Sequence, residues 1–240
     1  MPRLSAREVV LAAVFTVMTY AATVALQIYQ PVTGGYFNLG EAVIYLAALT
    51  ASPLVAAVAG GVGASLADLS TGYAIFAPAT LVIKFVEGYA AGWLVRKLRR
   101  GERGYVAAVG GLYFAVGAYY AAAYWSGGIE VGPSAWGITA FADVPLWIWL
   151  LAVLALSFAI AYAILRALVR GGEAIAVLLA GMLMVLGYFL YEYFVSNPLT
   201  GRPPINALYE VPVNIGQAVA GALIAVPLAA WLRRAGYSSG

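Results

Sequence analysis

Long apolar stretches separated by short polar connections run along the whole chain. A helix that crosses a membrane needs about 20 mainly apolar residues, and the pattern predicts eight helices. They cover residues 9–28, 39–51, 53–69, 78–98, 105–125, 144–168, 173–195 and 211–232. The second helix is short, and only Ser52 and Pro53 mark its boundary with the third. We therefore expect these two helices to form a tight hairpin, with Pro53 near the first position of the third helix.

The composition predicts the solvent around these helices. The chain is 64% hydrophobic and only 10% charged, with a mean hydropathy of +0.90, whereas a soluble domain carries about 25% charged residues. This is too little charge to cover a water-soluble globule, so the sequence predicts an all-α, polytopic membrane bundle as a single domain over residues 1–240. The first apolar run, 9–28, is longer than the 7–15 apolar residues of a signal peptide, and we interpret it as the first transmembrane helix.

Basic residues predict the orientation in the membrane. With eight helices and a cytoplasmic N-terminus, eleven of the thirteen basic residues fall on the cytoplasmic side, as the positive-inside rule requires. The eleven are Arg3, Arg7, Arg96, Lys97, Arg99, Arg100, Arg103, Arg166, Arg170, Arg233 and Arg234. We expect a multi-pass protein of the cell membrane with both termini cytoplasmic. The loops at 31–38, 70–77, 126–143 and 196–210 then face outward, and the net charge of +3 does not indicate a nucleic-acid partner.

Two residue types that serve much of enzyme chemistry are missing. The sequence has no Cys and no His, which excludes disulfides and thiolate chemistry and removes the usual metal ligand and neutral-pH proton carrier. We expect no metal, no cofactor and no enzymatic activity.

Ionisable residues within the apolar runs are candidates for a site, because at bilayer depth they usually face a bundle interior or a cavity. They are Glu41, Asp68, Lys84, Glu87, Asp143, Glu192 and Glu210. Lys84 and Glu87 are spaced i,i+3 and are expected to pair. Two stripes of small and polar residues lead to these charges, at 56, 60, 64 and 68 and at 80, 84, 88 and 92, and such stripes allow close approach of helices in lipid.

Further polar groups share helix faces near the predicted outer end. Tyr188, Tyr191 and Glu192 do so on the seventh helix, and Asn214 and Gln217 do so after Pro212, which we place at the start of the eighth. Such groups either bond helices together or line a small-molecule pocket, and their location on one side favours the pocket. The aromatic, turn-rich outer loops are typical both of binding loops and of an interfacial aromatic belt.

Several motifs in this order resemble a known family. Residues 35–41 read GYFNLGE, 60–69 GGVGASLADL, 77–88 APATLVIKFVEG, 187–192 GYFLYE and 211–217 VPVNIGQ. This is similar to the substrate-binding S component of an energy-coupling factor (ECF) vitamin transporter. The resemblance covers residues 1–103 and 173–240 as a six-helix core. Residues 104–172 are left as an inserted two-helix hairpin, either on the rim of the bundle or near the pocket.

The resemblance implies a division of labour. An S component captures a vitamin or related micronutrient from outside and docks on a T component coupled to two ATPase subunits. No GxxxxGK[ST] motif is present to bind nucleotide, so we expect the energy to come from those partners. The implied substrate-binding residues are Asn38, Glu41, Asp68, Tyr73, Lys84, Glu87, Tyr191, Glu192, Asn214 and Gln217. Small residues of the first helix imply a surface for the T component at Ala12, Thr16, Ala21 and Ala25.

Two other functions compete with this interpretation. A stand-alone secondary transporter of a small organic solute would need inverted repeats with broken helices, and the short second helix has no counterpart. A membrane enzyme would need a matched pair of carboxylates, and no such arrangement is evident. The identity of the substrate stays open, since Lys84 and Arg202 suit an anion whereas Glu87, Glu192 and Glu210 suit a cation.

Overall fold

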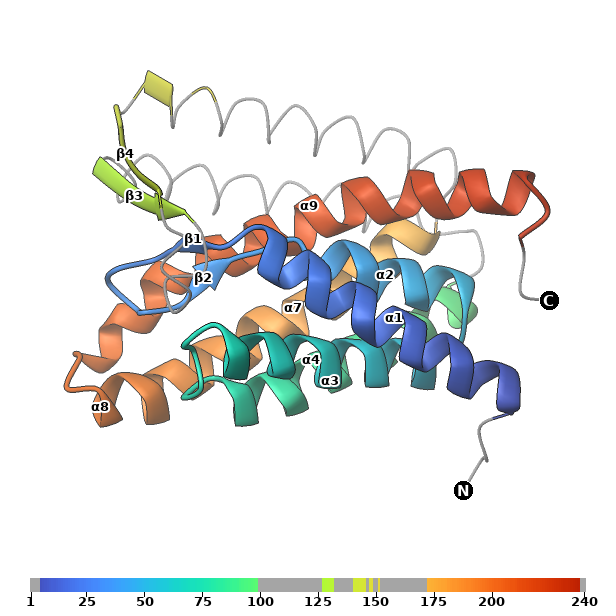
Figure 1. Cartoon of the computed structure of the whole chain (residues 1–240), viewed down its shortest axis with the longest axis horizontal. Helices are drawn as coiled ribbons and strands as arrows, with labels where there is room; N and C mark the ends of the chain where they lie inside the picture. Colours follow the sequence, from blue (N-terminus) through green and yellow to red (C-terminus); the bar gives the residue numbers. More distant parts are fainter. Residues whose placement is uncertain are drawn as a thin grey trace.

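The computed structural model describes residues 5–98, 127–131, 140–145, 147–148, 151 and 172–237, and within them the chain forms a helical bundle with a small sheet at one end (Figure 1). The long helices are α1 (Ala6–Ala25), α2 (Gly40–Thr50), α3 (Pro53–Ser70), α4 (Ala77–Lys97), α7 (Gly172–Tyr191) and α9 (Ala207–Arg234). The ends of each helix lie within about one turn of the ends of a predicted helix, which confirms the helical bundle. The predicted helix 105–125 and most of 144–168 lie outside the described residues, so the count of eight stays a prediction.

Capping residues determine where two of the helices begin. At α1 the Glu8 amide donates to Ser5 Oγ at 3.3 Å, and the Ser5 amide donates back to Glu8 Oε2 at 3.0 Å, which is a capping box. At α3 the hydroxyl of Ser52 accepts from the Val55 amide at 3.3 Å, and Pro53 occupies the first turn. The predicted hairpin of α2 and α3 is therefore confirmed, together with the place of Pro53.

Four stretches of the described chain are long and apolar enough to cross a membrane. They are Ala6–Ala25, Pro53–Ser70, Gly172–Leu199 and Pro204–Arg234. Large apolar side chains face outward from the bundle, for example Val17, Val82 and Trp231, each at least 60% exposed. An apolar outer surface of this kind suits contact with lipid, so the chain is a multi-pass membrane protein.

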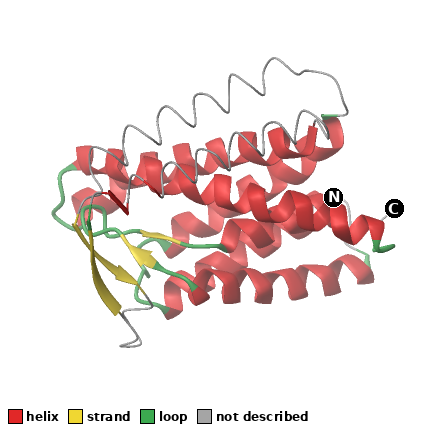
Figure 2. Ribbon diagram, turned by 90° about the horizontal axis from the view of Figure 1, so that it is seen from above, coloured by secondary structure: helices red, strands yellow, loops and turns green. Residues whose placement is uncertain are grey.

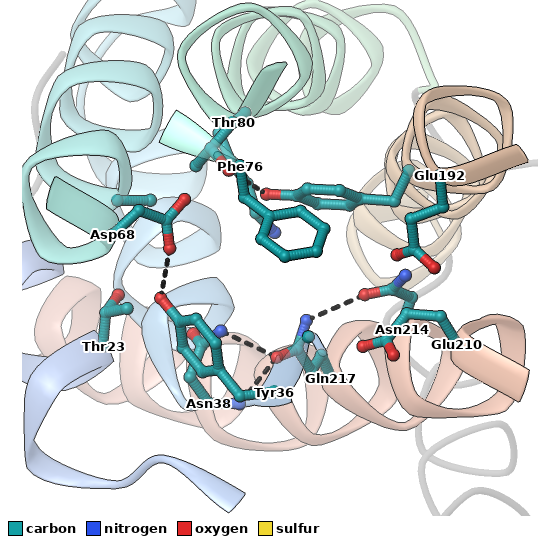
Figure 3. Close-up of a pocket in the computed structure, with 14 residues that line it drawn as sticks. Thr23, Tyr36, Asn38, Asp68, Phe76, Thr80, Glu192, Glu210, Asn214 and Gln217 are labelled. Carbon is teal, nitrogen blue, oxygen red and sulfur yellow. Dashed lines mark hydrogen bonds between the residues drawn. The ribbon is translucent and has the colours of Figure 1, made fainter. Parts of the chain in front are cut away.

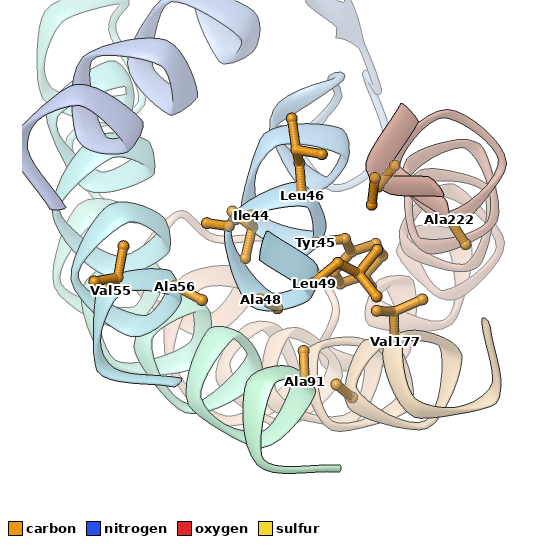
Figure 4. Close-up of a cluster of buried hydrophobic side chains, with 14 of the residues drawn as sticks. Ile44, Tyr45, Leu46, Ala48, Leu49, Val55, Ala56, Ala91, Val177 and Ala222 are labelled. Carbon is orange, nitrogen blue, oxygen red and sulfur yellow. The ribbon is translucent and has the colours of Figure 1, made fainter. Parts of the chain in front are cut away.

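Helix α2 lies at the centre of the bundle, where it packs against α1, α3, α4 and α9. It is buried on all sides, as expected for a helix that is apolar all round, and Ile44 and Tyr45 have no exposed surface. Figure 4 shows its side chains between Val55 of α3, Ala91 of α4 and Val177 of α7. This apolar core fills the half of the bundle that lies away from the sheet.

The two stripes of small residues bring α3 and α4 into close backbone contact. A Cβ atom at Gly60 of the first stripe would lie 2.8 Å from the carbonyl oxygen of Lys84 in the second, and one at Gly61, next to the stripe, would lie 2.7 Å from the Leu81 carbonyl oxygen. Both distances are too short for a Cβ atom, so only glycine fits at these two positions. The predicted close approach along these stripes is confirmed.

A four-stranded antiparallel sheet covers one end of the bundle (Figure 2). Its strands are β1 (Ile28–Tyr29), β2 (Tyr36–Phe37), β3 (Gly127–Val131) and β4 (Ala140–Val144), in the order β2-β1-β3-β4. The hairpin of β1 and β2 turns at Gly34, where φ is +79°, a value that favours glycine. The sequence predicts only loops over β1, β2, β3 and most of β4, and the two-residue strands β1 and β2 are too short to show an alternating pattern.

The connection from α7 to α9 differs from the prediction of an irregular loop at 196–210. Helix α7 continues as a π-helix, η2 (Glu192–Ser196), and a short helix α8 (Asn197–Leu199), and a 3-10 turn η3 (Pro204–Asn206) precedes α9. The placement of Pro212 at the start of the last helix was wrong, since α9 begins at Ala207. Proline inside a helix removes one backbone hydrogen bond, but α9 still includes the turn that precedes Pro212.

Candidate functional site

A polar cavity lies at the end of the bundle that carries the sheet. Its free space is about 400 Å³, a figure that includes the part open to solvent. The walls come from α1, the hairpin of β1 and β2, α3, α4, α7, η2 and α9 (Figure 3). The lining residues are Thr23, Gly35, Tyr36, Asn38, Ala64, Asp68, Phe76, Thr80, Lys84, Tyr188, Glu192, Glu210, Asn214 and Gln217.

A buried charge network lies where the cavity meets the apolar core. The Lys84 ammonium forms ion pairs with Glu41 of α2 and with Glu87, the latter at 3.2 Å. Tyr45 donates a hydrogen bond to Glu87 at 2.8 Å, and Lys84 lies 5.5 Å from the centre of the Tyr188 ring. The predicted pairing of Lys84 with Glu87 is confirmed. Through these ion pairs the network joins α2 to α4 beneath the cavity.

The hairpin of β1 and β2 closes one side of the cavity through Tyr36. Its hydroxyl donates to Asp68 Oδ1 at 2.6 Å, and its ring packs on that of Tyr73 with 4.2 Å between centres. Burial and the neighbouring Asp68 carboxylate raise the pKa of Tyr36 well above its usual value. The phenol therefore keeps its proton and acts as a donor.

Asn38, at the end of the same hairpin, bonds to α9. Its backbone N–H and its side-chain amide both donate to Gln217 Oε1, at 2.6 and 2.7 Å. The Gln217 amide in turn donates to Asn214 Oδ1 at 3.2 Å. Through Tyr36 and Asn38 the hairpin is thus hydrogen-bonded to α3 on one side of the cavity and to α9 on the other.

The opposite wall carries two acidic side chains. Glu210 accepts a hydrogen bond from the Thr33 hydroxyl of the hairpin, and Glu192 opens the π-helix η2. Glu192 is 1% exposed, and its Oε2 has no hydrogen-bond partner among the residues that the structure describes. Tyr188 lies one turn before Glu192 and is within 2.9 Å of the Thr80 hydroxyl. A π-helical turn places side chains differently from an α-helix and is frequent at functional sites.

Six of the ten substrate-binding residues predicted from the sequence line the cavity. They are Asn38, Asp68, Lys84, Glu192, Asn214 and Gln217. The other four surround it: Glu41 and Glu87 hold Lys84, while Tyr73 packs on Tyr36 and Tyr191 packs near Phe76 with its hydroxyl on the Ile75 carbonyl. Whether these residues contact a ligand stays a prediction.

Other lining residues were not assigned to the site from the sequence. They are Thr23, Gly35, Tyr36, Ala64, Phe76, Thr80, Tyr188 and Glu210. Spacing placed Ala64, Thr80 and Tyr188 on the correct helix faces, and Glu210 was recognised as a buried charge. Tyr36 lies in the motif at residues 35–41 but was not assigned to the site, because its position depends on how the hairpin folds back over the bundle. No sequence signal identified Thr23 of α1.

The four residues predicted to contact a partner do not share one exposed surface. Ala12 is 6% exposed and belongs to the apolar core. The backbone of Thr16 packs against Gly63, where a Cβ atom would lie 2.7 Å from the Thr16 carbonyl oxygen. Ala21 and Ala25 are exposed. A partner surface on α1 therefore stays a prediction, and Ala12 is buried away from it.

The two ends of the bundle differ in charge. Arg96 and Lys97 lie in the last turn of α4, and Arg233 and Arg234 in the last turn of α9. Figure 1 places these helix ends at the end of the bundle opposite the sheet. Arg233 pairs with Glu173 at the start of α7, at 2.7 Å. The cavity is therefore at the end remote from this cluster of basic residues.

The fold and the cavity define a class of protein, a multi-pass helical membrane protein with a polar small-molecule cavity at one end. Residues 3–166 match the family of the ECF-type riboflavin transporter, S component. This match covers more than half of the chain, and the chain belongs to that family. Its members are substrate-binding subunits of transporters, not enzymes. The matched range also runs through most of 104–172, the segment that the sequence motifs did not cover.

A relative from Pyrococcus woesei is named "Uncharacterized protein in gap 3'region". It is 46% identical to this chain over 71 residues, which are 30% of this chain and 47% of that protein. The match therefore spans about half the length of the curated relative.

Proposed function

We propose that this chain is the substrate-binding S subunit of an ECF-type ABC importer and captures a vitamin of the riboflavin class from outside the cell. The observation that carries the proposal is the polar, aromatic-lined cavity beneath the hairpin of β1 and β2. Its hydrogen-bonding side chains and the rings of Tyr36, Phe76 and Tyr188 provide both orientation and stacking for an aromatic micronutrient.

The charge distribution supports an outward position of the cavity. Arg96, Lys97, Arg233 and Arg234 lie at the opposite end, and the positive-inside rule places such an end in the cytoplasm. Both termini are then cytoplasmic and the hairpin faces the outside. A ligand enters near the hairpin and is enclosed when Tyr36 and Asn38 make their hydrogen bonds to α3 and α9.

Energy for import comes from partners in this proposal. The S subunit docks on a membrane T component, which is coupled to two cytoplasmic ATPase subunits. The chain alone then exchanges ligand between solution and the cavity, and release into the cell requires the partner complex. Membership of the S-component family supports this assignment of roles over that of a stand-alone secondary transporter.

Riboflavin binding and uptake by the purified chain test the proposal. In detergent, the fluorescence of riboflavin should change on saturable binding to one site per chain. In liposomes that contain this chain alone, riboflavin should bind without accumulating, with or without an ion gradient. Accumulation driven by a gradient would contradict the proposal and support the secondary transporter, and an absence of saturable binding would remove riboflavin as the ligand.

A further inference from the structure

Two buried acids share one buried base beneath the cavity. Glu41 of α2 and Glu87 of α4 both form ion pairs with the Lys84 ammonium. Both glutamates are 0% exposed, and Lys84 is 2% exposed. If all three groups carried their usual charges, one cation would face two anions. The cluster would then hold one surplus negative charge inside the bundle.

The other cations of the described chain lie elsewhere. Arg202 is beside the hairpin turn at Gly34. The remaining basic residues lie in the first or last turn of a helix, and they are Arg7, Arg96, Lys97, Arg233 and Arg234. Within the part of the chain that the structure describes, Lys84 is therefore the one cation placed at the two glutamates.

The titratable groups around the cluster do not offset the surplus charge either. Tyr45 of α2 donates a hydrogen bond to Glu87 at 2.8 Å, and the centre of the Tyr188 ring of α7 lies 5.5 Å from the Lys84 ammonium. The cavity lining adds three acids, which are Asp68, Glu192 and Glu210. These groups are phenols and carboxyl groups, and neither kind supplies a positive charge.

Close helix packing shuts the two glutamates off from water. A Cβ atom at Gly221 of α9 would lie 2.5 Å from the Glu41 Cβ atom, and one at Gly40 would lie 2.5 Å from the Thr23 hydroxyl oxygen of α1. Lys84 belongs to the cavity lining, but the two glutamates do not. An uncompensated charge in such surroundings is costly, and two acids that share one site avoid this cost when one of them is neutralised.

One oxygen of the cluster also has no donor. Glu87 accepts hydrogen bonds at both of its oxygens, from Tyr45 and from Lys84. Glu41 Oε2, in contrast, has no hydrogen-bond partner among the described residues. Buried carboxylate oxygens are normally satisfied. A bound proton removes this conflict, since a neutral carboxyl group is less costly to bury than a carboxylate.

We propose that Glu41, Lys84 and Glu87 form a proton-binding site, which holds one proton more than the ion pairs alone would contain and so has no net charge. The number of protons is the same whether Lys84 stays charged beside one neutral acid or gives its proton to the second acid. The extra proton therefore belongs to the cluster and not to one residue. This inference goes beyond the proposed function and applies to the ligand-free protein, whatever ligand the cavity takes.

Infrared spectroscopy of the purified, ligand-free chain in detergent tests the proposal, because carboxylic acids and carboxylates absorb at different frequencies. Glu41→Gln and Glu87→Gln each leave one acid beside Lys84, and that pair is neutral without an extra proton. We expect each variant to lose the carboxylic acid absorption of one group per chain. The matched control is Glu173→Gln, whose acid is 29% exposed and pairs with Arg233, and which should lose carboxylate absorption instead.

The pH dependence of stability is a second measurement. The unfolded chain releases the extra proton above about pH 4, the usual range of glutamate. The unmodified chain therefore unfolds more readily as the pH rises, until the cluster itself ionises. Glu41→Gln lacks this proton. The unfolding equilibrium constant in mixed detergent micelles should thus rise about tenfold more per pH unit in the unmodified chain than in Glu41→Gln.

Two results would overturn the proposal. Loss of carboxylate rather than carboxylic acid absorption in the cluster variants would mean that both acids are ionised in the folded protein. The same pH slope in the unmodified chain and in Glu41→Gln would mean that folding takes up no proton at this cluster. The two glutamine variants are measured separately, so either one that folds decides the infrared test, and neither test depends on whether riboflavin binds.

Discussion

A lysine in the middle of a membrane bundle is costly unless its charge is compensated. Lys84 is 2% exposed and is compensated by Glu41 from α2 and by Glu87 from its own helix. The i,i+3 spacing allowed the pair with Glu87 to be predicted from the sequence. The pair with Glu41 could not be predicted, because it depends on the packing of α2 against α4.

We predict that Lys84→Met destabilises the protein by about 3–5 kcal/mol, because it leaves two buried carboxylates without their shared cation. Tyr45→Phe removes one hydrogen bond from the same network and should cost only about 1 kcal/mol. Unfolding in mixed detergent micelles measures both.

The double variant Lys84→Met with Glu41→Gln serves as the control for this explanation. It should recover part of the lost stability, since one unpaired charge is removed. A Lys84→Met variant no less stable than Tyr45→Phe would show that the ion pairs are not essential to the fold.

At the scale of elements, the contact between α3 and α4 positions Asp68, Thr80 and Lys84 along the cavity. The glycines of α3 allow this contact, because the α4 backbone occupies the space where their side chains would be. Van der Waals packing of this kind is the main source of association between helices in lipid.

We therefore predict that Gly61→Ala lowers the stability of the protein by about 1–3 kcal/mol, since the added methyl group would overlap the Leu81 carbonyl oxygen. Gly216→Ala on α9 is the matched control. Its Cβ atom would meet only Phe37, at an ordinary 3.7 Å, so stability should be unchanged or slightly higher. Thermal unfolding of the two variants in detergent makes the comparison, and equal melting temperatures would contradict the role of close packing.

The elements that could be predicted are those with strong local signals. Long apolar runs predicted α1, α3, α4, α7 and α9, and a two-residue connection predicted the hairpin of α2 and α3. The sheet could not be predicted, because β1 pairs with β3 across about 100 residues of sequence, for example Ile28 with Val131. For the same reason the sequence predicted the helical walls of the cavity but not Tyr36, which the hairpin places over it.

For the whole molecule, the account requires one orientation in the membrane, with the hairpin outside and both termini inside. The chain has no native cysteine, so single cysteines can be introduced and labelled without background. We predict that Thr200→Cys reacts with a membrane-impermeant maleimide added outside intact cells, and that Tyr237→Cys reacts only after the membrane is opened. Both positions are exposed, so the reverse pattern would mean that the orientation is inverted.

The most direct test of the central claim, that this cavity binds the ligand, is the riboflavin affinity of Gln217→Ala. Gln217 holds Asn38 of the hairpin and contacts Asn214. Its loss should weaken binding by about 1–3 kcal/mol, or roughly five- to over a hundredfold. The control, Thr50→Ala, removes a hydrogen bond to the Leu46 carbonyl at the other end of α2 and should bind riboflavin as the unmodified chain does. If Gln217→Ala lowers the melting temperature of the ligand-free protein but keeps full affinity for riboflavin, these residues only bond helices together and the ligand site lies elsewhere.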